Sequence, residues 1–133
     1  MDATEFVRVV SLRRGKIRPG EFRLREGEVG LSLFARVNDP RPEVIWEAVR
    51  EAGKQGDLGL AVLTADSLQA LGLQLVRTPG GTPSEAVNRV HHEARLPWVR
   101  RLWLRVRFRS VTAYFNDKLS PRINASARLW EGE

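Results

Sequence analysis

The sequence predicts a single α+β domain, with a mixed, mostly antiparallel sheet of about five to seven strands and two or three helices packed on one face. The length of 133 residues fits one domain, because single hydrophobic cores are commonest at ~100–150 residues. The composition, 42% hydrophobic and 29% charged, is typical of a globular chain. Short apolar segments with strand-like alternation are separated by turn residues and by helical patterns.

Residues 5–12 and 29–37 predict the first two strands. The first segment is rich in Val and Phe, and a turn at Gly15 ends it. In the second segment, Leu31 and its alternate neighbours face one way, while Ser32 and its alternate neighbours face the other.

A helix is expected next. Asn38 or Asp39 can supply its N-cap, and two prolines stand in its first turn, where a missing N–H costs little. Apolar residues then recur at helical spacing until Gly53 or Gly56 ends the pattern. These apolar positions are Ile45, Ala48, Val49 and Ala52.

Residues 58–63 and 73–77 predict two more strands on either side of a helix of about two turns at 65–71, with Thr64 as its N-cap. This order of strand, short helix and strand resembles a compact crossover unit. Residues 78–84 predict an irregular loop. Its Gly-Gly-Thr sequence lacks the Lys-Ser/Thr continuation of a phosphate-binding P-loop, so we interpret it as a connection.

The segment 85–96 fits two patterns, because its apolar spacing suits a helix while alternate residues also suit a strand. We interpret it as a strand that Pro97 ends. Residues 110–119 predict either a short helix or part of a hairpin, and residues 123–130 alternate as a last strand.

Residues 102–109 show the sharpest alternation in the chain, with an apolar residue at every even position. As a helix, the segment would place apolar side chains on opposite sides and leave no single stripe free of arginine. We therefore predict a strand with one apolar face and one face of Trp and Arg side chains.

The net charge of +6 comes from the last third of the chain. Residues 89–133 carry ten basic and four acidic groups, whereas the first 88 residues carry equal numbers of each. Between Arg89 and Arg109 there are seven arginines and a single acid, Glu93. Such a local field concentrates anions.

The Trp and Arg face predicts a nucleic-acid-binding surface for RNA or single-stranded DNA. Alternate strand residues lie roughly 6.5–7 Å apart, close to the phosphate spacing of an extended strand, and an indole can stack on a base. The alternative is that these arginines form the solvated outer face of a sheet. The residues concerned are Arg100, Arg101, Trp103, Arg105, Arg107 and Arg109.

A second function class is a protein-interaction subunit of a larger assembly. Trp and Arg are enriched at the energetic centres of protein interfaces. In this interpretation Trp98, Trp103 and Trp130 form the interface together with neighbouring arginines.

A third class is a small metal-independent nuclease or nucleotide-modifying toxin that uses His91 or His92 for acid–base chemistry. Adjacent strand residues face opposite ways, so in the predicted strand His92 points inward and His91 outward. Glu93, two residues from His91, can then share its face and orient its ring.

Several classes are excluded or not expected. The chain has no cysteine, which excludes disulfides, thiolate zinc sites and cysteine nucleophiles. We expect no cofactor and no metal, because the two adjacent histidines of a strand cannot chelate one ion. The N-terminus is acidic, and the longest uncharged stretch is far shorter than the ~18–20 residues that span a bilayer. We therefore expect a cytoplasmic protein without a membrane partner.

Two segments resemble a pattern in small uncharacterised bacterial proteins. The first reads Phe-Arg-Leu-Arg-Glu-Gly-Glu-Val-Gly-Leu-Ser-Leu-Phe over residues 22–34, and the second is Val87-Asn88 followed by His92-Glu93-Ala94. The resemblance implies a bacterial cytoplasmic protein from a gene neighbourhood devoted to conflict or defence. It also gives weight to Ser32, Asn88 and His92 as the residues of a pocket.

Overall fold

An antiparallel sheet forms the middle of the molecule, and the computed structural model describes residues 4–107 and 110–131. The α+β prediction is confirmed. The strands are β1 (Glu5–Arg13), β2 (Lys16–Ile17), β3 (Gly30–Ala35), β4 (Leu58–Thr64), β5 (Gln74–Arg77), β6 (His91–Arg95) and β7 (Arg128–Leu129). The helices are α1 (Pro42–Glu51), α2 (Ala65–Ala70), α3 (Glu85–Arg89), α4 (Trp98–Val106), α5 (Val111–Tyr114), the π-helical η1 (Phe115–Leu119) and α6 (Ser120–Ser126).

Strand β1 lies at the centre of the sheet, whose order is β5-β6-β3-β1-β4-β7 with β2 paired to β1. Phe6 and Val10 face one core cluster, while Val7 and Val9 face another. Both faces of β1 are therefore covered, which explains why its sequence is a nearly continuous apolar run.

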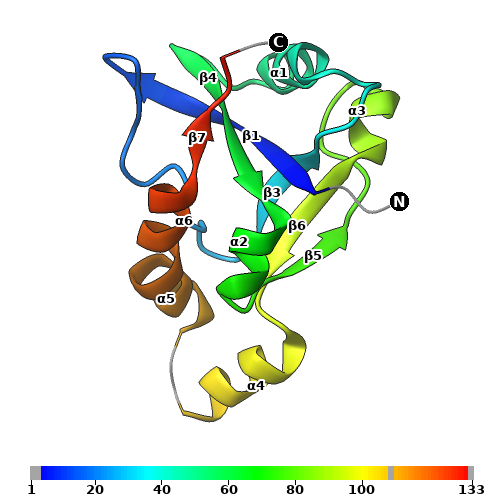
Figure 1. Cartoon of the computed structure of the whole chain (residues 1–133). Helices are drawn as coiled ribbons and strands as arrows, with labels where there is room; N and C mark the ends of the chain where they lie inside the picture. The colour runs from blue at the N-terminus through cyan, green and yellow to red at the C-terminus, as the bar shows by residue number, and fades with distance from the viewer. Residues whose placement is uncertain (1–3, 108–109, 132–133) are drawn as a thin grey trace.

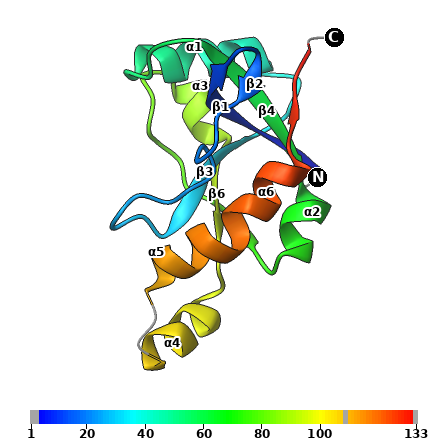
Figure 2. The ribbon, with the colours of Figure 1, turned by 90° about the vertical axis from the view of Figure 1, so that its left-hand side faces the viewer.

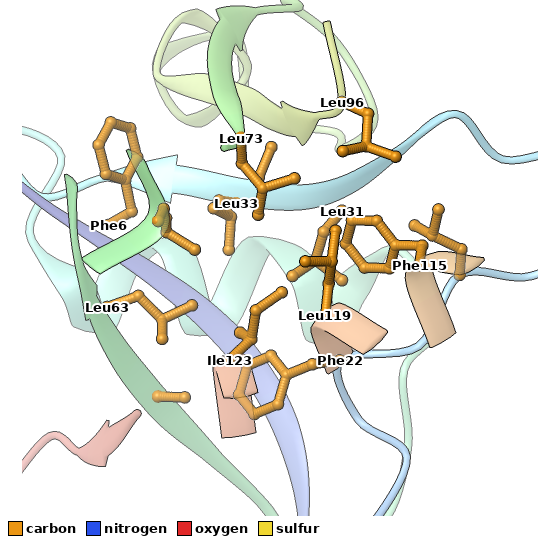
Figure 3. Packing of buried hydrophobic residues seen from close by; sticks show 14 of the residues in the cluster. Phe6, Phe22, Leu31, Leu33, Leu63, Leu73, Leu96, Phe115, Leu119 and Ile123 are labelled. Carbon is orange, nitrogen blue, oxygen red and sulfur yellow. The ribbon is translucent and has the colours of Figure 1, made fainter. Parts of the chain in front are cut away.

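The larger core lies on the face covered by α2, η1 and α6 (Figure 2). Phe115, Leu119 and Ile123 are spaced by four residues and form one buried stripe along the η1–α6 helix. Figure 3 shows these side chains with Leu31 and Leu33 of β3 in this core. The segment 110–119 is thus helical, and the predicted strand over 123–130 is wrong up to Ser126, because this helix stripe runs through it.

The opposite face is covered by α1 and α3 through Ile45, Ala48 and Val87. The expectation that the helices pack on one face is therefore wrong. Helix α1 begins at Pro42 with Arg41 as its N-cap residue, not Asn38 or Asp39.

Two further expectations are wrong, one because of strand order and the other because of a local helix cap. Strands β4 and β5 are not neighbours, because β1, β3 and β6 lie between them, so the strand, helix and strand order is no crossover unit. The predicted strand over 85–96 divides into α3 and β6. Ser84 caps α3 by accepting a hydrogen bond from the Val87 amide at 3.3 Å, and Val87 is fully buried.

The most consequential correction concerns residues 98–106, which form the helix α4 and not part of a strand. The sequence argued against a helix because apolar side chains would lie on opposite sides and leave no stripe free of arginine. Apolar side chains do lie on opposite sides of α4: Leu104 is fully buried, while the others face solvent. The second part of the argument is wrong, because the exposed apolar residues of α4 share one side of the helix that its arginines flank. The alternation of 102–106 therefore does not reflect a sheet.

Candidate functional site

Helix α4 lies at one end of the molecule, opposite the end formed by α1 (Figures 1 and 2). At about 100° per residue, its apolar residues other than Leu104 fall within one arc of about 140°. Their side chains are between 43% and 67% exposed. We call this feature the apolar arc of α4. Its residues are Trp98, Leu102, Val106, Val99 and Trp103.

Arginines flank the apolar arc on both sides. Arg100 and Arg107 follow Trp103 around the helix, and their guanidinium carbons lie 5.0 and 4.6 Å from the centroid of its ring. Arg101 and Arg105 lie beyond the opposite edge of the arc. Across the described ranges 4–107 and 110–131, none of these four arginines pairs with a carboxylate. Their charge is available to an external anion.

A cavity of about 280 Å³ lies beside α4 and is lined by Arg101, Arg105, Thr112 and Glu28, among others. The Nε atom of Arg101 is buried and has no hydrogen-bond partner in the described part of the chain. Leaving such a donor unpaired costs about 1–3 kcal/mol. Glu28 also lines this cavity, and its carboxylate accepts a hydrogen bond from the Arg25 amide at 2.5 Å.

The predicted Trp and Arg residues thus lie together, but on a helix, so the argument from strand spacing is wrong. Arg109 lies outside the described residues. Trp130 is not part of the surface with Trp98 and Trp103, because it packs beside β7 against the core cluster under α1.

A second site, which we call the Ser32 cavity, lies between β3, β6 and the end of α1. The register pairs Phe34 with His91, so Ser32 and His91 share one face of the sheet. The Oγ atom of Ser32 lies 2.5 Å from Nε2 of His91. Thr78 approaches the other ring nitrogen, with its carbonyl oxygen 2.6 Å and its hydroxyl 2.9 Å from Nδ1. Because a carbonyl can only accept, Nδ1 carries the proton, and Nε2 of the neutral ring accepts from the Ser32 hydroxyl.

Two cations line the same cavity, whose volume is about 160 Å³. Arg8 donates from Nε to the Glu21 carbonyl at 2.9 Å and from Nη1 to the Ser32 carbonyl at 2.8 Å. These bonds lie where β1 and β3 separate beyond their two paired positions. Burial lowers the pKa of Arg8, and the carboxylates of Glu21 and Glu28 oppose this shift. The guanidinium stays protonated, as arginine does in proteins. Lys54 is the second cation, and its Nζ lies 3.5 Å from Glu21.

The loop at Gly81 and Thr82 also lines the Ser32 cavity. Asn88 holds this loop in place: its Oδ1 accepts from the Thr82 amide at 2.8 Å and from the Thr82 hydroxyl at 2.7 Å, and its Nδ2 donates to the Thr82 carbonyl at 2.9 Å. Asn88 therefore shapes the cavity without lining it.

Of the three residues predicted for a pocket, Ser32 lines the cavity, Asn88 only holds the adjacent loop, and His92 is elsewhere. His92 lies on the opposite face, where its ring meets the edge of Phe6 at 5.2 Å and its Nδ1 lies 2.8 Å from the Val90 carbonyl. His91 takes its place. The sheet is covered on both faces, so His91 is half-buried and does not point outward.

The predicted role of Glu93 is also wrong. Its carboxylate accepts from Arg95 Nε at 2.8 Å, and Thr78 orients His91 instead. Sequence reasoning missed Arg8, Lys54 and Thr78. Arg8 did leave a signal, since a charged residue within an apolar central strand needs buried partners. Lys54 and Thr78 left none, because only the fold brings them near Ser32.

No protein-family model, curated protein or solved structure matches this chain. The resemblance to bacterial defence-associated proteins therefore stays a prediction. Within residues 4–107 and 110–131, three or more potential metal-ligating side chains do not come together, and helices of the length and hydropathy needed to cross a membrane are absent.

Proposed function

We propose that the protein binds single-stranded nucleic acid, RNA or DNA, through α4. The observation that carries the proposal is the exposed apolar arc between two rows of arginines that lack carboxylate partners in the described residues. An unpaired strand has complementary chemistry, because its bases present apolar faces and its phosphates are anionic.

In this proposal the arginines that flank the arc bind phosphates, and a tryptophan of the arc stacks on a base. A base stacks on the half-exposed ring of Trp103 when one of the two guanidinium groups that lie over this ring, from Arg100 and Arg107, moves onto an adjacent phosphate. On the other side of the apolar arc, Arg101 and Arg105 line one cavity, where their guanidinium groups meet a further phosphate. A duplex keeps its base faces stacked, so single strands are preferred.

A protein partner is the second candidate, and a specific observation favours it. Val99, Leu102 and Val106 contribute exposed aliphatic surface. An apolar groove on a partner protein would cover this aliphatic surface better than nucleic-acid bases would. Such a partner would need a groove rimmed by carboxylates to meet the arginines.

The test is a fluorescence-anisotropy titration with labelled single strands of about 20 nucleotides, at salt concentrations from about 50 to 200 mM. The double variant Arg105→Ala with Arg107→Ala is expected to weaken binding and to flatten the salt dependence, by about 0.7 in slope for each phosphate that the protein no longer neutralises. Trp103→Ala is expected to weaken binding by about 1–3 kcal/mol with little change in slope, because it removes stacking and not charge.

Arg122→Ala is the matched control, since it removes an exposed arginine from α6 and leaves α4 intact. Equal effects of the control and the double variant would show that α4 is not the binding surface. If the wild-type protein does not bind single strands at about 50 mM salt, the proposal is contradicted. A protein partner would then be the better explanation of the exposed apolar arc.

A further inference from the structure

We infer that the Ser32 cavity hydrolyses phosphate esters of small alcohols, with Ser32 as the nucleophile and His91 as its general base. The inference is independent of nucleic-acid binding. The cavity borders the end of α1, and α1 and α4 lie at opposite ends of the molecule (Figures 1 and 2).

The geometry of the pair meets the requirement for an activated nucleophile. A serine hydroxyl is weak by itself and needs a base within hydrogen-bond reach, held in turn by a third group. Nε2 of His91 lies 2.5 Å from Ser32 Oγ, and the Thr78 carbonyl keeps the ring proton on Nδ1. The edge-on ring of Phe34, 5.1 Å away at 70°, fixes the plane of the imidazole.

The two cations that line the cavity, Arg8 and Lys54, indicate that the group attacked by Ser32 is anionic. The two bonds of Arg8 to carbonyl oxygens use two of its five N–H groups. Lys54 brings a second charge to the same cavity, with a loose pairing to Glu21 at 3.5 Å. A phosphoryl group carries more than one anionic oxygen and matches both cations, and arginine in particular suits it. A neutral carboxylic ester would leave most of this charge unused.

The reaction balances with water as its one co-reactant. In the first step Ser32 Oγ bonds to phosphorus and gives its proton to Nε2 of His91. The bond from phosphorus to the alcohol oxygen breaks, and that oxygen takes the proton from Nε2. In the second step water gives a proton to Nε2 and bonds to phosphorus. The bond from phosphorus to Ser32 breaks, the serine oxygen recovers the proton, and inorganic phosphate leaves.

The size of the cavity sets the substrate class. A volume of about 160 Å³ lies below the range of roughly 300–1,000 Å³ that is typical of sites for drug-sized ligands. The cavity therefore takes the phosphoryl group and a short alcohol, and a polymer chain does not fit inside it.

The experiment follows the release of inorganic phosphate from methyl phosphate, an ester of a short alcohol, and, in parallel, maps phosphorylation of Ser32 by mass spectrometry after acid quenching. Wild type is expected to turn over the substrate and to show the modified serine. Ser32→Ala is expected to remove both signals, and His91→Gln to lower kcat by about 10²–10⁴-fold. His92→Gln is the matched control and is expected to retain activity within about threefold, because His92 lies on the other face of the sheet.

Thermal unfolding of each variant shows whether a loss of activity is a loss of fold. Lys54→Met provides a second variant at the cavity, and a several-fold rise in KM with a smaller change in kcat is expected, because one cation no longer meets the phosphoryl oxygens. The Arg105→Ala and Arg107→Ala double variant is expected to keep full turnover, while Ser32→Ala keeps its affinity for single strands, so the two proposals can fail separately.

Three outcomes would overturn the inference. One is a wild-type protein with neither turnover nor modified Ser32. Another is undiminished activity in Ser32→Ala. The third is hydrolysis of p-nitrophenyl acetate without hydrolysis of methyl phosphate, which would assign the serine to acyl chemistry.

Discussion

Arginine side chains have opposite environments in two regions of this molecule, enclosed in the sheet and exposed on α4. In the sheet, Arg8 is enclosed between β1 and β3 and donates to two main-chain carbonyls. On α4, Arg105 and Arg107 are exposed, and across residues 4–107 and 110–131 they have no carboxylate partner. A dense run of arginines in the sequence thus marks a surface, whereas a single arginine within an apolar strand marks a cavity.

The two regions also differ in how they are held. The Ser32 cavity is built on β3 and β6, which pair along five positions and lie between two covered faces. Helix α4 buries Leu104 and presents its apolar arc to solvent. The proposed hydrolysis needs fixed geometry and is therefore assigned to the sheet, while the proposed binding tolerates an adaptable surface and is assigned to the helix.

The largest expected effect compares a leucine in each region. Leu33→Ala is expected to lower the free energy of unfolding by about 2–5 kcal/mol, because it empties a site at the centre of the larger core. Leu102→Ala on the apolar arc is expected to change it by no more than about 0.5 kcal/mol. Urea denaturation measures both. Comparable losses would mean that α4 is covered in solution.

An intermediate effect on the free energy of unfolding is expected when the same substitution is made at two arginines, one in each region. Arg8→Met keeps much of the buried volume but leaves the carbonyls of Ser32 and Glu21 without a donor, so a loss of about 1–3 kcal/mol is expected. Arg107→Met is expected to stay within about 0.5 kcal/mol. Urea midpoints distinguish the two, and a neutral Arg8→Met would show that water can replace the guanidinium.

The smallest effect comes from arginines between these extremes. The Glu5 carboxylate pairs with Arg36 at 2.7 Å and Arg128 at 2.9 Å, which ties β1 to the start of β7. Burial alone would raise the pKa of Glu5, but the hydrogen bonds and charges of both arginines outweigh it, and the pKa is lowered. This stabilisation is therefore present above the ordinary glutamate pKa of about 4.3 and is lost as the pH falls through the lowered value.

Glu5→Gln is accordingly expected to flatten the acid limb of the stability curve by a few tenths of a kcal/mol, since partly exposed pairs contribute little. Urea denaturation between about pH 2 and pH 7 tests this. Glu47→Gln, an exposed position on α1, serves as the control. An unchanged acid limb in Glu5→Gln would show that the pairs do not persist in solution.

Local patterns predicted β1, β3, β4, α1 and α2 well, because the strands are short apolar runs between turn residues and α1 buries the side that its helical spacing selects. Helix α4 was predicted wrongly because it does not follow this rule for helices. The period argument assumes that a helix turns its apolar side inward, and α4 turns most of its apolar side outward. The spacing of residues along the sequence does not show that a helix will turn its apolar side toward solvent.

The amino-acid sequence by itself determined the α+β class, most of the strands, and the concentration of arginine near residue 100, because propensity, alternation and charge are local properties. The tertiary structure alone decided which groups meet at Ser32. Arg8, Ser32, Thr78 and His91 come from four separate segments, and strand order and register bring them within hydrogen-bond distance of one another. Register is a property of paired strands, so the site exists only once the sheet has formed.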